Sequence, residues 1–252
     1  MSEVAVSIRG LKKSFGTRTI LDGIDLDIYR GEIMYIIGKS GSGKSVTLKH
    51  ITALLRPDEG EVRIHGKNIF EMDDKELIEV RKKMGVLFQM AALFDSLTVF
   101  ENVAFLLRRF TKDDEDTITK KVRERLRLVG LSHVEHLKPA DLSGGMQKRV
   151  GLARAIALNP EIVLYDEPTT GVDPILAAAV DDLILKLNHE LGVTSIVISH
   201  DMESVFRVAD RVAMLYDGQF RLIGTPDDFR NSQDPVIRQF VEGSAKGPIP
   251  IL

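Results

Sequence analysis

At residues 38–45 the chain reads Gly-Lys-Ser-Gly-Ser-Gly-Lys-Ser, and this stretch decides the fold. It follows a continuous apolar run, Ile33–Ile37, which is typical of a buried parallel strand, and it leads into a helical pattern at Lys44–Leu55. A glycine-rich loop between strand and helix can turn its backbone N–H groups toward a phosphate, while the positive end of the helix attracts the same anion. The stretch therefore predicts a phosphate-binding loop. Lys44 would span the β and γ phosphates of ATP, and Ser45 would give Mg²⁺ its hydroxyl.

A flexible Gly/Ser turn is the alternative interpretation of this loop. A dinucleotide-binding fingerprint is excluded, because Val46 stands where the third glycine of that pattern should be.

Strand and helix patterns alternate along most of the chain. Val4–Arg9 and Ile24–Ile28 alternate apolar and polar residues like half-buried antiparallel strands. Further strands are predicted at Glu61–Ile64, Met84–Phe88, Ile162–Tyr165, Ser195–Ile198 and Val212–Tyr216, and helices at Phe100–Arg109, Asp113–Val129, Gln147–Leu158, Pro174–Glu190 and Met202–Val208. No strand signal occurs between Met90 and Pro160. The pattern predicts an α/β fold with a parallel sheet, an antiparallel β part and a helical insertion.

Composition excludes several classes of protein. The 252 residues are 44% hydrophobic and 28% charged, which is ordinary globular usage. The absence of cysteine excludes disulfides, thiolate metal sites and a cysteine nucleophile. A net charge of −3 gives no sign of a nucleic-acid track, and no apolar run approaches the roughly 18 residues of a membrane span. These features predict a soluble cytosolic protein.

Two adjacent acids end the predicted strand at Ile162–Tyr165. Asp166 and Glu167 would lie at the carboxyl edge of the sheet, where ligands bind. We expect Asp166 to hold Mg²⁺ through water and Glu167 to polarise the attacking water as catalytic base. A solvated turn is the alternative for such a pair.

Three more residues are candidates at strand ends. His200 follows Ser195–Ile198 and could hydrogen-bond the γ phosphate, although a capping or core histidine is the simpler interpretation. Gln89 follows Met84–Phe88 and could reach the metal or the water. Phe15 could stack on adenine or simply pack in the sheet.

A second anion-binding helix end is predicted where Ser143-Gly144-Gly145 precedes a helical run. One chain would then have two phosphate sites for one nucleotide. A head-to-tail homodimer resolves this, because each Ser143 helix would cap the γ phosphate held by the Lys44 loop of the other chain. A purely structural N-cap is the alternative.

From about Val4 to Gly224 the sequence resembles ATP-binding subunits of ABC transporters, which are P-loop NTPases. The resemblance implies an ATPase with ATP and Mg²⁺ as cofactors. It makes Gln89 the Q-loop residue, Asp166 the acid of the second phosphate motif, Glu167 the base, Asp173 the D-loop acid and His200 the switch. It implies nucleotide contacts at Phe15, Gly38, Lys39, Ser40, Gly41, Ser42, Gly43, Lys44, Ser45, Ser143, Gly144, Gly145 and Asp173, and metal contacts at Ser45, Gln89 and Asp166.

Two positions depart from the family pattern. Lys39 stands where proline or alanine is common, and Met146 where glutamine is common. Neither change removes a catalytic group, but an extra cation near the phosphates could alter nucleotide affinity.

Finer features resemble the Mla branch, which drives phospholipid transport between the membranes of Gram-negative bacteria. These are Leu87–Phe105, Tyr165–Ile175 and the ending Asp234–Phe240 with Gly247–Pro250. The resemblance implies a homodimer on the cytoplasmic face of the inner membrane, bound to integral membrane permease subunits. It also implies an MCE-domain lipid-binding protein and a small cytoplasmic STAS-domain protein in the complex, and no nucleic-acid partner.

Rival functions remain at this point. An importer ATPase for amino acids or another small solute shares all the catalytic motifs. A nucleotide-switched scaffold acting on DNA or ribosomes is disfavoured by the single nucleotide domain and the near-neutral charge. Acyl hydrolysis lacks a G-x-S-x-G elbow.

Two surfaces are predicted to bind partners. Leu93, Phe94, Phe100 and Phe105 are too apolar for a solvated excursion and predict a groove for a permease helix. We take the ATP-binding domain as residues 1–242, with a helical subdomain at about 90–158, followed by an extended tail, Gly243–Leu252. Its apolar residues Ile249, Ile251 and Leu252 would dock on a neighbouring subunit.

Overall fold

The computed structural model describes residues 3–250, so the predicted contacts of Ile251 and Leu252 lie outside the described residues. The chain divides into two units. Unit 1 comprises Met1–Met72 and Ile196–Leu252, and unit 2 comprises Asp73–Ser195. Within residues 3–250, no helix is both long enough and apolar enough to cross a membrane.

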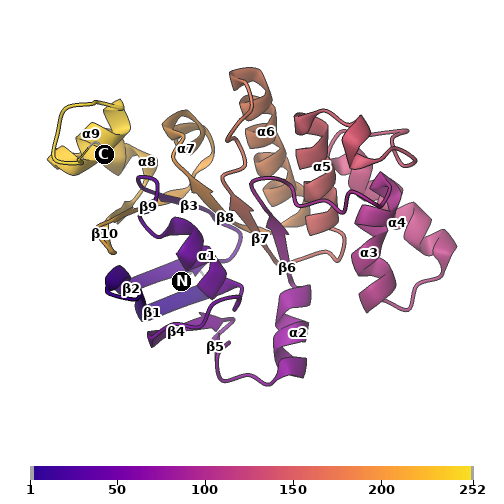
Figure 1. Ribbon diagram of the computed structural model, residues 1–252, viewed down its shortest axis with the longest axis horizontal. Coiled ribbons are helices and arrows are strands. Elements are labelled where there is room, and N and C mark those ends of the chain that lie inside the picture. The colour runs from indigo at the N-terminus through magenta and orange to yellow at the C-terminus, as the bar shows by residue number, and fades with distance from the viewer. Residues whose placement is uncertain (1–2, 251–252) are drawn as a thin grey trace. The chain divides into compact units, whose positions relative to one another are not determined.

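Unit 1 combines an antiparallel sheet with parallel strands (Figure 1). The antiparallel sheet has the order β2-β1-β4-β5, formed by β1 (Val4–Phe15), β2 (Arg18–Tyr29), β4 (Glu59–Ile64) and β5 (Lys67–Asn68). β3 (Ile33–Ile37) is buried at every position and pairs in parallel with β9 (Arg211–Tyr216). Burial on both faces explains its unbroken apolar sequence. The helices of unit 1 are α1 (Lys44–Ile51), α7 (Met202–Val208), α8 (Pro226–Arg230) and α9 (Pro235–Glu242).

A tight turn joins β9 to β10 (Gln219–Gly224), which pairs antiparallel to it. The turn residues Asp217 and Gly218 have φ values of 52° and 78°. Positive φ at both central residues is what a two-residue hairpin turn requires, and an Asp-Gly pair meets this demand at little cost.

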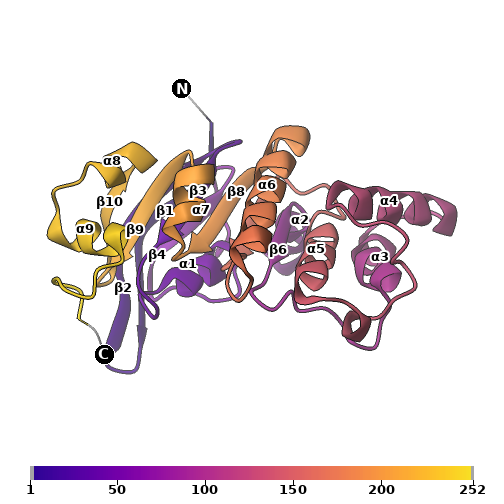
Figure 2. The ribbon, with the colours of Figure 1, turned by 90° about the horizontal axis from the view of Figure 1, so that it is seen from above.

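Unit 2 is mainly helical, and its strands β6 (Met84–Leu87) and β7 (Ile162–Asp166) pair in parallel. Its helices are α2 (Asp74–Lys82), α3 (Val99–Phe110), α4 (Glu115–Leu128), η1 (Pro139–Asp141), α5 (Gly144–Ala155) and α6 (Pro174–Leu191). α3 and α4 pack against α5, as Figure 2 shows. β8 (Thr194–Ser199) crosses the boundary between the units. The chain thus has the parallel strands, antiparallel sheet and helical segment that the sequence predicts.

The C-terminal tail differs from the predicted extended strap. Residues 245–249 bend, and the chain returns to α9 instead of running away from it. The Gln239 side chain explains the bend, because its Oε1 accepts from Ile249 N at 2.6 Å and its Nε2 donates to Ile249 O at 3.1 Å. One amide therefore satisfies both backbone groups of Ile249.

Candidate nucleotide-binding site

The loop at residues 38–45 closes around the ammonium group of Lys44. Lys44 Nζ donates to the carbonyl oxygens of Gly38 at 2.8 Å and Lys39 at 3.2 Å. A Cβ at Gly38 would overlap the carbonyl oxygen of Leu215, so the close approach of loop and β9 requires glycine there. The loop therefore has the curled form predicted for a phosphate cradle, and a flexible turn does not describe it.

The start of α1 is suited to an anion. Its N-cap is Gly43, which has a φ of 109° and offers no side-chain cap. By contrast, Thr98, Ser143 and Asp173 cap α3, α5 and α6 with side-chain oxygens. Ser42 Oγ beside this end is buried and has no hydrogen-bond partner among residues 3–250. An uncapped helix end and an unsatisfied hydroxyl group both fit phosphate oxygens.

Unit 1 also holds Phe15 and His200. Phe15 is the last residue of β1, and 51% of it is exposed, which excludes the interpretation that it simply packs in the sheet. His200 directly follows β8 and is exposed, so it is not a core histidine. The next residue, Asp201, accepts from Glu203 N at 3.0 Å and caps α7, which leaves the capping role to the aspartate.

The acids predicted as metal ligand and base lie in unit 2. Asp166 is the last residue of β7, and Glu167 follows with a φ of 50°. This left-handed conformation costs a residue with a side chain about 1–3 kcal/mol, and such strain concentrates at active sites. Thr170 Oγ1 donates to Glu167 Oε2 at 3.1 Å, which holds the carboxylate in this turn. No sequence pattern indicated this conformation.

The second helix end has the predicted cap. Ser143 Oγ accepts from Met146 N at 3.3 Å, so Ser143 is an N-cap of α5. This cap does not by itself exclude a phosphate contact. Ser143 and Gly144 are exposed, and the first turn of α5 has no acidic residue. The positive end of α5 therefore remains open to an anion from outside the chain. Asp173 is likewise an N-cap, because its Oδ1 accepts from Ile175 N at 3.0 Å.

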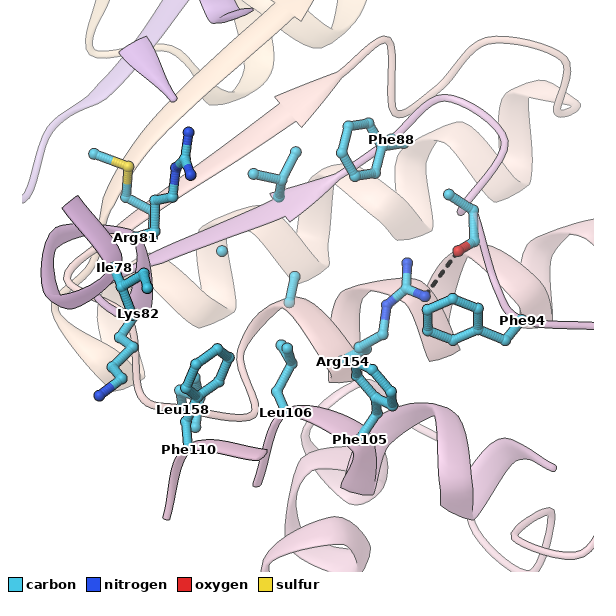
Figure 3. Close-up of a pocket in the computed structure, with 15 residues that line it drawn as sticks. Ile78, Arg81, Lys82, Phe88, Phe94, Phe105, Leu106, Phe110, Arg154 and Leu158 are labelled. Atoms are coloured by element: carbon cyan, nitrogen blue, oxygen red, sulfur yellow. Dashed lines mark hydrogen bonds between the residues drawn. The ribbon is translucent and has the colours of Figure 1, made fainter. Parts of the chain in front are cut away.

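Gln89 lies in an exposed turn after β6, and an arginine from α5 holds the residues that follow it (Figure 3). Ala91 and Ala92 have left-handed φ values of 57° and 49°. Arg154 donates to both of their carbonyl oxygens, at 2.8 and 2.7 Å. Burial lowers the pKa of Arg154, although a guanidinium group stays charged. The sequence interpretation missed Arg154. A single cation within the otherwise apolar helical stretch at residues 150–157 could have indicated it.

A pocket of about 510 Å³ lies beside this turn. Four half-exposed phenylalanines line it: Phe88, Phe94, Phe105 and Phe110. The rings of Phe94 and Phe105 are 5.1 Å apart, and the Arg154 guanidinium lies 5.7 Å from the Phe94 ring centre. Figure 3 shows Arg154 pointing to this corner of the pocket.

A pocket is thus present in the predicted region, but only two of the four residues predicted to line it do so. Phe94 and Phe105 line the pocket, whereas Leu93 and Phe100 do not. The Phe100 ring instead lies under the Arg108 guanidinium, 5.6 Å away.

The sequence profile of the ABC transporter family matches residues 21–170, more than half of the chain. The chain belongs to the ABC transporter family. Binding and hydrolysis of ATP follow from that membership. This ABC ATPase is 43% identical, over 98% of its length and 71% of the relative, to a probable ribonucleotide transport ATP-binding protein, mkl, of Mycobacterium leprae.

A second relative and a solved structure are also similar to this ABC ATPase. It is 41% identical, over 99% of its length and 94% of the relative, to the intermembrane phospholipid transport system ATP-binding protein MlaF of Haemophilus influenzae. The solved dimer of the ATP-binding cassette MJ0796, in a post-hydrolysis state bound to ADP and Pi, matches with a TM-score of 0.80 and 35% identity. That match covers 88% of this chain and 98% of the other. The fold is therefore that of an ABC ATPase cassette.

Proposed function

We propose that this ABC ATPase drives phospholipid transport between the inner and outer membranes. The supporting observation is the near full-length likeness to MlaF, of which the chain covers 94%. The relative named for ribonucleotide transport is slightly more identical, but the chain covers only 71% of it. Transport of a small solute is therefore the second candidate.

The proposal gives each candidate residue a role in ATP binding or hydrolysis. Phe15 stacks on adenine, and the loop at residues 38–45 holds the phosphates with Lys44 between them. Glu167 polarises the attacking water and accepts its proton, while His200 donates a hydrogen bond to the γ phosphate.

Ser45, Gln89 and Asp166 would hold Mg²⁺. A hydroxyl, an amide carbonyl and a carboxylate offer only oxygen, which is the ligand type that Mg²⁺ prefers. Residues 3–250 contain no cluster of three His, Cys, Asp or Glu side chains suited to a metal. This donor set fits an ion that is also held by phosphate oxygens. When bound, Mg²⁺ neutralises charge on the phosphates.

The complete site is composite, with Ser143 of each chain acting on the nucleotide held by Lys44 of its partner. The exposed, positive end of α5 supports this arrangement. Ile175, two residues after Asp173, is 82% exposed, and a large apolar side chain so placed fits a surface that a second copy covers. The dimeric solved cassette is a further support.

Composite sites predict complementation between two inactive variants. Ser143→Arg should bind ATP but hydrolyse it poorly, because its lesion lies in the site of the partner. Lys44→Ala should not bind ATP. Mixed dimers should regain one competent site, and therefore measurable activity of at most about half of the wild-type rate per dimer. The rate is measured on dimers purified through two different affinity tags, with Ser143→Ala as the milder control. Purified heterodimers without activity would contradict the head-to-tail arrangement.

We propose that the aromatic pocket binds a short cytoplasmic helix of an integral membrane permease. Its half-exposed rings offer an apolar surface, and Arg81 and Lys82 add positive charge to the lining. An apolar helix that carries an acidic residue would fit both features. The ATPase would thereby be held on the cytoplasmic face of the inner membrane. An MCE-domain lipid-binding protein and a small STAS-domain protein complete the proposed complex.

Phe94→Asp should uncouple the ATPase from the permease. Docking of the permease helix would bury the new carboxylate against apolar groups, which opposes binding, whereas position 94 is half-exposed in the free chain and allows it to fold. The ATPase rate should be near normal for the isolated chain and lose its stimulation by the membrane complex. Leu54→Asp is the control, since Leu54 is 59% exposed and does not line the pocket. A Phe94→Asp chain that fails to fold, or that is still stimulated, would contradict the docking role.

The proposed function is tested on the complex purified from membranes. Co-purifying proteins and lipids are identified, and ATPase activity is measured with and without phospholipid. An MCE-domain protein and bound phospholipid are the expected result. A soluble solute-binding protein in their place would favour the second candidate.

A further inference from the structure

Lys148 is a buried cation in α5 that donates hydrogen bonds to the loop directly after Glu167. It is 8% exposed, and its Nζ donates to the carbonyl oxygens of Pro168 and Thr170, both at 2.7 Å. Burial lowers the pKa of this ammonium group, because desolvation disfavours its charged form. Burying an ammonium is unfavourable unless its donors find partners, and the two carbonyls provide them.

The loop that Lys148 holds is the one that carries the proposed base. Pro168 directly follows Glu167, and Thr170 donates its hydroxyl to Glu167 Oε2 at 3.1 Å. Thr170 N also donates to Glu167 O at 3.2 Å. Lys148, Thr170 and Glu167 therefore form one continuous chain of hydrogen bonds inside unit 2.

The side chain of Leu176, in the first turn of α6, lies beside α5. A Cβ at Gly145 would be 3.4 Å from Leu176 Cδ1. Leu176 N in turn donates to Asp173 Oδ1 at 3.1 Å. α5 is thus bonded to the loop at residues 167–173 through Lys148, and its first turn lies beside Leu176, which is bonded to the last residue of that loop.

We propose that Lys148 is a positioning residue that couples the two ATP sites of the dimer. The inference rests on the proposed function, in which Ser143 acts on the nucleotide of the partner and Glu167 acts on the nucleotide of its own chain. A phosphate that engages the Ser143 end moves α5, and Lys148 transmits the movement to Pro168 and Thr170. Occupancy of one site thereby sets the position of the base in the other.

The test compares three variants of the full-length dimer. Lys148→Met keeps the length of the side chain and removes the charged donors, whereas Lys148→Arg keeps donors for both carbonyls. Lys186→Met is the matched control, because Lys186 also donates to a backbone carbonyl of unit 2, that of Leu128 at 3.1 Å, but at the surface. The Hill coefficient of ATPase activity, kcat, ATP affinity and thermal unfolding are measured for each.

We expect a wild-type Hill coefficient above 1 that falls to 1 in Lys148→Met, with a loss in kcat of roughly threefold to tenfold. ATP affinity should not change, because Lys44 lies in unit 1. Lys148→Arg should restore the Hill coefficient, and Lys186→Met should behave like the wild type. A merely structural lysine would lower the unfolding temperature and leave the Hill coefficient unchanged.

Either of two results would overturn the inference: a wild-type Hill coefficient of 1, or an unchanged coefficient in Lys148→Met. If Lys148→Met does not fold, Lys148→Gln removes the charge but keeps an N–H donor, and it should lower the Hill coefficient part of the way to 1. Failure of the proposed function is distinct, because mixed Ser143→Arg and Lys44→Ala dimers would then regain no activity. Regained activity with an unchanged coefficient overturns the role of Lys148 alone.

Discussion

Replacing Lys44 with alanine will abolish ATP binding. Lys44 is 6% exposed, and its ammonium group lies inside the loop, where it donates to the carbonyl oxygens of Gly38 and Lys39. Its charge therefore meets the phosphates away from water, where removing one partner of an ion pair costs about 3 kcal/mol or more. The dissociation constant of ATP, measured by calorimetric titration, should rise at least about 100-fold.

Lys39→Ala is the matched control, since it removes a lysine from the same loop. The Lys39 carbonyl, which accepts from Lys44, belongs to the backbone and persists in this variant. A small change in affinity is expected. Equal affinity in the Lys44→Ala and wild-type chains would show that residues 38–45 do not hold the phosphates.

Glu167→Gln will bind ATP and lose most of its turnover. Glutamine has the same shape and still accepts the hydrogen bond from Thr170, but it cannot take a proton from water. Loss of a general base lowers a rate by roughly 100-fold to 10,000-fold. Single-turnover hydrolysis measures the loss, and size-exclusion chromatography with ATP should reveal an accumulated dimer.

Glu167→Asp tests whether the position of the carboxylate matters as well as its ability to accept a proton. Aspartate keeps the carboxylate, but its shorter side chain moves that group closer to the backbone. Its rate should lie between those of the wild type and Glu167→Gln. A near-normal rate in Glu167→Gln would assign the base to another residue.

The sequence predicted the parts of the molecule that depend on local chemistry. The bounds predicted for β3 and α7 match the structure. β3 is buried on both faces and therefore has an unbroken apolar sequence, and α7 begins after the capping residue Asp201. The phosphate loop was predictable because few sequences other than a glycine-rich one can adopt its backbone. The turn at Asp217 and Gly218 has a similar local cause, because an Asp-Gly pair readily adopts positive φ.

Features that depend on distant partners or lack an apolar stripe were missed. α2 buries none of its residues, so it gave no periodic signal, although Asp73 and Glu76 form a capping box that could have revealed it. β5 has only two residues and pairs with β4. Arg154 and Lys148 were missed because their partners lie in other segments of the chain.

The bent tail was missed for a related reason. Its form depends on Gln239, which lies ten residues before Ile249. The side-chain amide of Gln239 bonds both backbone groups of Ile249. Prolines at positions 248 and 250 oppose a helix, but they do not distinguish an extended chain from a bent one.

The interrupted course of unit 1 affects how the protein is made. Ile33 N at the start of β3 donates to the carboxylate of Asp210, 177 residues further along the chain. The ribosome synthesises the uninterrupted stretch Asp73–Ser195 before Asp210, so unit 2 can begin to fold while β3 still lacks its partner strand β9. The carbonyl of Leu215, which lies beside Gly38 in the folded loop, is also synthesised late. The ATP-binding loop is therefore among the first segments synthesised and among the last to acquire its shape.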